Sequence, residues 1–176
     1  LLGQNQMNNK GDTMELQDVN IGLANFWKVT CLDKDGNVKW EENKKNIIVT
    51  TGLNHILDTQ FHASTQVTTW YIGLKGAGTP VAADTMASHS SWAELAGYSG
   101  NRKEWTEGAA SSGSMTNSSS VDFTINATAT VAGAFLNTAS TGTSGTLYGV
   151  VDFSSSRAVI SGDTLQVTVT VTAASA

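Results

Sequence analysis

The sequence AVISGDTLQVTVTVTA, at residues 158–173, is the most regular stretch of the chain. From Leu165 to Thr172 the side chains alternate without a break, with Leu or Val at odd positions and Gln or Thr at even positions. A β-strand places successive side chains on opposite faces, so this pattern predicts a strand with one apolar face and one polar face. A helix would bury several of the threonines. The Ser-Gly-Asp turn at residues 161–163 precedes the strand.

Other segments supply partners for this strand. Short apolar or alternating runs recur at intervals of roughly 8–15 residues, and Ser, Gly and Thr dominate the linkers, which is typical of an antiparallel sandwich or jelly roll. We therefore predict a mainly β fold, an antiparallel β-sandwich or jelly roll, as a single domain over residues 21–176. The predicted strands cover residues 26–32, 37–41, 46–50, 70–75, 102–105, 121–126, 129–137, 146–153 and 164–172.

One helix is predicted at TTGLNHILDTQF, residues 50–61, with its core at about 51–61. Thr50 or Thr51 is the expected N-terminal cap. The helix carries an apolar side at i, i+3, i+4 and i+8, which suits it to close one end of a sheet structure. The residues of that side are Leu53, Ile56, Leu57 and Phe61.

A second, shorter helix is expected within residues 82–95 (AADTMASHSSWAEL). Asp84 is placed to cap it. Met86 and Trp92 are the large apolar side chains that would anchor it to the sandwich.

Charge and cysteine content exclude several classes of protein. The formal net charge is −5 and the isoelectric point is near 5.0, which disfavours nucleic-acid binding and basic membrane-surface binding. No apolar run is long enough to span a bilayer. From the charge and from this absence together, we expect neither a nucleic acid nor a membrane as partner. The one cysteine, Cys31, excludes an internal disulfide and is expected to be buried.

The last third of the chain is poor in charge. Residues 109–176 contain four charged side chains in 68 positions, and 25 Ser or Thr. A surface of this kind is unusual for a free cytosolic protein. It is explained if much of the surface is β-sheet, where Thr is favoured, or is covered by other subunits.

Residue types suited to catalysis or metal binding do not form a recognisable motif. His55 and His62 are seven positions apart, and His89 lies apart from both. The carboxylate pairs at 41–42 and at 104 and 107 are expected to be exposed charges. With no nucleophile elbow and no phosphate-binding loop, we expect no enzyme activity, no cofactor and no metal.

The five tryptophans raise the possibility of a carbohydrate-binding platform. All of them lie in the first 105 residues, beside apolar strands that need large side chains for packing. A glycan-binding module for host attachment is therefore kept as an alternative to a structural role.

Several motifs across residues 46–176 resemble those of small virion structural proteins of tailed bacteriophages. The motifs are TGLNHILD at 51–58, WYIGL at 70–74, ADTMASHSSW at 83–92, FTI at 123–125, VAGAFL at 131–136, LYG at 147–149 and SGDTLQVT at 161–168. Such proteins are commonly capsid decoration (cement) proteins or components of head and tail fibres.

The resemblance implies a non-enzymatic capsid decoration protein on the exterior of the virion. Proteins of this sort resemble jelly rolls that sit on the shell as homodimers or homotrimers and bridge neighbouring capsomers. The expected partners are then the major capsid protein and further copies of the chain. A tail-fibre, collar or baseplate adaptor protein is the alternative position.

Candidate contact residues follow from this setting. Residues 1–20 are rich in Asn, Gln and Asp and are predicted to form an extended arm that is ordered on binding. Tryptophans are frequent anchors of interfaces, and the Thr side of the C-terminal strand is a candidate packing surface. The candidate interface residues are Leu1, Leu2, Trp27, Trp40, Trp92, Thr168 and Thr170.

Overall fold

The alternating C-terminal stretch forms strand β10 (Thr164–Ser175) in a computed structural model that describes residues 21–175. The strand pairs antiparallel along its length with β1 (Ile21–Leu32), the first described strand. Its apolar side chains point into the core and three of them are fully buried: Leu165, Val167 and Val169. The predicted burial of this strand face is therefore confirmed.

The first sheet has five strands, with β1 and β10 at its centre. Strand β2 (Val38–Lys45) follows β1 after a tight turn and pairs with the side of β1 that β10 leaves free. On the other side of β10, β6 (Ser114–Thr116) and β7 (Val121–Thr124) pair with successive parts of the strand. Strand β6 was not predicted from the sequence, because its three residues are too few to show a period.

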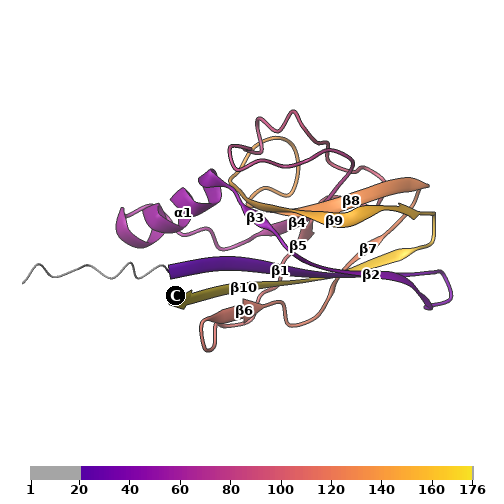
Figure 1. The fold of residues 1–176 in the computed structure, drawn as a ribbon, viewed down its shortest axis with the longest axis horizontal. Helices are drawn as coiled ribbons and strands as arrows, with labels where there is room; N and C mark the ends of the chain where they lie inside the picture. Colours follow the sequence, from indigo (N-terminus) through magenta and orange to yellow (C-terminus); the bar gives the residue numbers. More distant parts are fainter. Residues whose placement is uncertain (1–20, 176) are drawn as a thin grey trace, which may run out of the picture.

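The second sheet also has five strands, in the order β3-β9-β8-β4-β5. All its pairings are antiparallel. The two sheets lie face to face with the main apolar core between them (Figure 1). The predicted mainly β, antiparallel sandwich is confirmed. The strands of this sheet are β3 (Ile47–Ile48), β9 (Leu147–Val159), β8 (Ala129–Asn137), β4 (Tyr71–Lys75) and β5 (Lys103–Glu104).

Helix α1 (Thr50–Phe61) has the bounds that the sequence predicts, but its cap is different. The N-cap residue is Val49, and no side chain caps the helix. The Thr51 hydroxyl donates instead to the carbonyl oxygen of Leu147 (2.9 Å), which ties the first turn to β9. The prediction that Thr50 or Thr51 caps the helix is wrong, because a tertiary acceptor takes the hydroxyl of Thr51 and Thr50 already lies within the helix.

The predicted helix within residues 82–95 is also wrong, since this segment forms turns and isolated bridges. The Asp84 carboxylate accepts hydrogen bonds from the backbone N–H of Val81 (2.8 Å) and from the indole N–H of Trp92 (2.9 Å), which folds the segment into a loop. Met86 and Trp92 are nevertheless buried, as predicted, in a second apolar cluster with Phe135 of β8.

The two sheets are joined by an ion pair between the buried Glu42 and the half-buried Arg157, which the sequence does not predict. Glu42 of β2, expected to be exposed, is only 4% exposed. It accepts hydrogen bonds from Arg157 Nε (3.0 Å) and Ser154 Oγ (3.1 Å) of β9. Burial alone would raise the pKa of Glu42, but these donors outweigh it and hold the pKa below its ordinary value.

The remaining expectations concern Cys31, two strand bounds and the N-terminal arm. Cys31 is free and buried, as predicted. Strand β1 begins earlier than the predicted residue 26, and β9 continues past the predicted residue 153. Among the described helices none is both long and apolar enough to cross a membrane. The predicted arm at residues 1–20, with Leu1 and Leu2, lies outside the described residues.

Candidate functional site

The outer face of the first sheet brings together residues from three strands. Because Trp27 and Val29 of β1 point into the core, Phe26 and Lys28, which alternate with them along the strand, point outward. The strand register then sets two rows that run from β2 across β1 to β10. These rows are Lys45–Phe26–Thr170 and Asn43–Lys28–Thr168.

These rows surround a shallow hollow of about 360 Å³, which we call the outer-face hollow. Phe26 is 47% exposed there, although its neighbours on this face are polar. Thr168 and Thr170, both predicted contact residues, are half-buried in its wall. The lining residues are Phe26, Trp27, Lys28, Asn43, Lys44, Lys45, Thr168 and Thr170.

The outer-face hollow is basic in a chain that is acidic as a whole. Lys28 forms an exposed ion pair with Glu41 at 3.5 Å. Lys45, the other lysine that points to this face, forms no ion pair within residues 21–175. The hollow therefore combines uncompensated positive charge with an exposed aromatic ring.

The tryptophans do not form an exposed platform. Trp27, Trp92 and Trp105 are buried in the apolar clusters. Trp27 and Trp92 were predicted as interface anchors, and both pack against the core of their own chain. Trp40 is half-buried against Phe153, with ring centroids 5.9 Å apart. A contact with another chain stays a prediction for Trp40.

A second surface lies on α1. Gly52 and Ile56 face the sandwich, where Gly52 lies against the backbone of Tyr148. Three apolar residues spaced by four point away from it, which we call the helix stripe: Leu53, Leu57 and Phe61, exposed by 39%, 56% and 80%. The predicted apolar side of this helix is thus divided, with only Ile56 packed against the main core.

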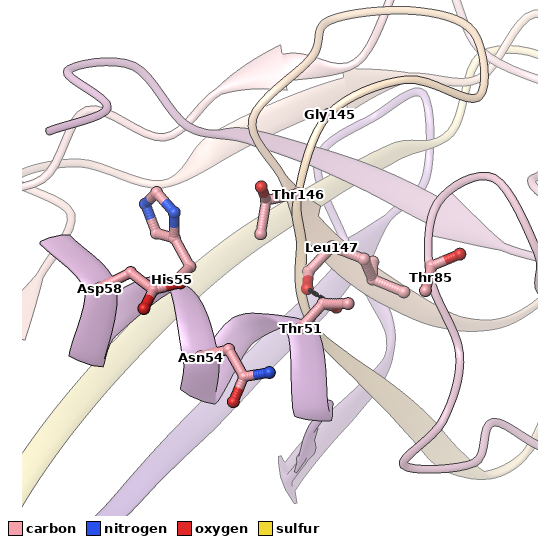
Figure 2. Close-up of a pocket in the computed structure, with 8 residues that line it drawn as sticks. All are labelled: Thr51, Asn54, His55, Asp58, Thr85, Gly145, Thr146 and Leu147. Carbon is pink, nitrogen blue, oxygen red and sulfur yellow. Dashed lines mark hydrogen bonds between the residues drawn. The ribbon is translucent and has the colours of Figure 1, made fainter. Parts of the chain in front are cut away.

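A polar pocket of about 260 Å³ lies between α1 and the start of β9 (Figure 2). Its hydrogen bond from Thr51 to Leu147 is structural, as described above. The pocket holds His55, while His89 stacks on Trp92 and His62 is the C-cap of α1. The lining residues are Thr51, Asn54, His55, Asp58, Thr85, Gly145, Thr146 and Leu147.

The polar pocket has no arrangement that specifies a reaction. The described residues contain no group of three or more His, Cys, Asp or Glu side chains that could hold a metal ion. The outer-face hollow and the helix stripe are the surfaces whose composition calls for a partner.

Comparison with known proteins adds one match. The sequence model of a family described as Podophage GP4 fiber I protein gp80 matches residues 46–174. This range contains the second sheet, α1 and most of β10, whereas β1 and β2 precede it entirely. No curated protein matches the chain.

Proposed function

The chain belongs to the family of the podophage GP4 fiber I protein gp80, and we propose that it is a non-enzymatic structural component of a fibre on a tailed-phage virion. The observation that carries this proposal is the match over residues 46–174, most of the sandwich. The sequence resemblance to phage virion proteins agrees with the family. The role that we first expected from this resemblance, capsid decoration, does not agree with the description of the family. That description favours the alternative, a fibre component.

The β-sandwich suits a load-bearing role. Its strands β1 and β10 pair over twelve successive residues, and the Glu42–Arg157 pair joins the two sheets. Most core side chains are fully buried between the sheets. A fibre component needs this rigidity, together with surfaces that bind its neighbours.

The helix stripe is the surface that we assign to assembly. Exposed apolar side chains in a contiguous row mark contact sites on soluble proteins. Leu57 and Phe61 lie within the matched family range, and a fibre repeats its subunits, so a second copy of the chain is the partner that we propose. This retains the expected homodimer or homotrimer.

The copy number in purified virions tests the proposed position. Quantitative mass spectrometry measures the ratio of this chain to the major capsid protein. A fibre component is expected at a small fraction of the copy number of the capsid protein. A comparable copy number would instead support decoration of the shell with the major capsid protein as partner, and would overturn the fibre proposal.

A further inference from the structure

We propose that the outer-face hollow binds an acidic saccharide. In this site Phe26 stacks on a sugar ring, and the surrounding lysines bind the carboxylate or phosphate groups of the saccharide. The proposal goes beyond a structural role in a fibre, because it assigns a ligand to a surface away from the helix stripe.

The exposed ring of Phe26 is the first argument. Phe26 lies on the solvent face of the sheet centre, with Lys45 and Thr170 as its cross-strand neighbours. It is 47% exposed, and nothing in the described residues covers its outer side. One face of a pyranose ring carries C–H groups, which an accessible aromatic ring removes from water on stacking.

The charge of the hollow is the second argument. Two amines lie on this face, those of Lys28 and Lys45, and Glu41 pairs with only the first of them. Lys44 is the cross-strand partner of the core residue Trp27, so its side chain points to the other face of the sheet. A cluster of one sign raises the local concentration of ions of the opposite sign. The site therefore selects an anionic ligand. The same charges would repel a second copy of this face across a two-fold axis.

The remaining lining groups favour a saccharide over an acidic protein segment. Thr168 and Asn43 contribute a hydroxyl and an amide that make no side-chain hydrogen bond within the described chain, and Thr170 donates to Thr116 (3.1 Å), which leaves its oxygen free to accept. A stable protein interface needs about 800 Å² on each partner and several apolar anchors. The hollow has one such anchor and several hydrogen-bonding groups.

Calorimetric titration of the full chain tests the site. The probes are oligogalacturonate, which carries carboxylates, and a phosphorylated oligomannoside. A neutral malto-oligosaccharide and poly-L-glutamate serve as comparison ligands. We expect at least one acidic saccharide to bind, more tightly than either comparison ligand, and its affinity to fall with added salt.

Two variants tie the binding to the hollow. Phe26→Ala and Lys45→Gln are each expected to lower the affinity about tenfold. Matched controls are Ile160→Ala, an exposed apolar side chain in the β9–β10 turn, and Lys34→Gln, an exposed lysine in the β1–β2 turn, which should bind like the wild type. Thermal melting checks that each variant is folded.

Three results would overturn the proposal: no binding of either acidic saccharide, binding that Phe26→Ala leaves unchanged, or equal binding of poly-L-glutamate. The last would identify a site for acidic peptides. None of these results bears on the copy number of the chain in the virion, so the fibre proposal stands or fails separately.

Discussion

At the scale of single residues, Gly52 sets how closely α1 can approach the second sheet. A Cβ atom at this position would lie 2.2 Å from the carbonyl oxygen of Tyr148, which is backbone and cannot turn aside. Alanine normally favours a helix over glycine by about 1 kcal/mol. We expect Gly52→Ala to reverse that sign and destabilise the protein by about 1–3 kcal/mol, measured by chemical denaturation.

Asn54→Ala is the matched control for this prediction, because Asn54 is exposed on the same helix. That substitution should leave the free energy of unfolding unchanged or raise it slightly. A Gly52→Ala variant as stable as the control would contradict the close contact between α1 and β9.

Glu42 makes the stability of the sandwich depend on pH. Its pKa lies below the ordinary value in the folded protein, so the unfolded chain binds the proton more readily. The stabilisation is therefore present above the ordinary glutamate pKa and is lost as the pH falls through the lower, folded pKa. We expect Glu42→Gln to lower the free energy of unfolding by about 2 kcal/mol at pH 7.

Urea denaturation from pH 7 to pH 3 measures this effect. The difference between wild type and Glu42→Gln should shrink as the pH falls. Glu41→Gln, which removes an exposed partner of Lys28, should cost no more than about 1 kcal/mol. A similar loss for both variants at neutral pH would show that the buried pair does not join the sheets as described.

At the scale of elements, the local pattern of apolar residues predicted the segments whose structure is decided by their own sequence. The alternation over residues 165–172 specified β10 and its buried face, and the apolar spacing of residues 50–61 gave the bounds of α1. Strand β8 also has its predicted bounds. In β10 and α1 a repeating pattern sets the element, whereas β8 is a continuous run of buried side chains.

The same reading failed where a distant group decides the structure. The Thr51 hydroxyl binds Leu147, and Asp84 binds the indole of Trp92, so neither caps a helix. Glu42 is buried because Arg157, far along the chain, lies opposite it. Local sequence carries no information about these partners.

The outer-face hollow was predicted in part. Thr168 and Thr170 were proposed as contact residues from the alternation of their strand, and they do line the hollow. Phe26 was missed, although its place beside Trp27 in the run FWKVTCL puts the two rings on opposite faces of a strand. Lys45 joins them only through the register of β2 on β1, which the sequence does not show.

The helix stripe gives a prediction at this scale. The double substitution Leu57→Glu with Phe61→Glu changes exposed side chains, so the melting temperature should stay close to that of the wild type. Self-association should be lost, because burying the two new carboxylates against a second copy, with no opposite charge to pair with them, is costly. Analytical ultracentrifugation measures the oligomeric state of the wild type and of the double variant.

Asn54→Glu is the control, since it adds charge to the polar side of the same helix. It should associate like the wild type. If the double variant also associates like the wild type, copies of the chain meet through another surface.

At the scale of the whole molecule, the first described strand and the last one hold the sandwich together. β1 pairs with β10 from Ile21 to Leu32, and this pairing spans nearly the entire described chain. The matched family range, residues 46–174, omits β1. A fragment limited to this range would leave one side of β10 as an open edge and would remove Trp27, Val29 and Cys31 from the main core.

We therefore expect the fragment 46–175 not to fold alone and to aggregate, whereas the fragment 21–175 should fold. Circular dichroism and size-exclusion chromatography of the two fragments measure this difference. A monomeric 46–175 fragment that melts cooperatively like the longer one would mean that β1 and β2 are an addition to an independent domain.

The fibre proposal places the chain away from the head shell. Electron microscopy of intact virions labelled with gold-conjugated antibodies against residues 21–175 determines this position. The fibre assignment predicts gold particles along fibres that project from the virion, with the head shell unlabelled. Gold distributed over the surface of the head shell, with none on the fibres, would contradict it.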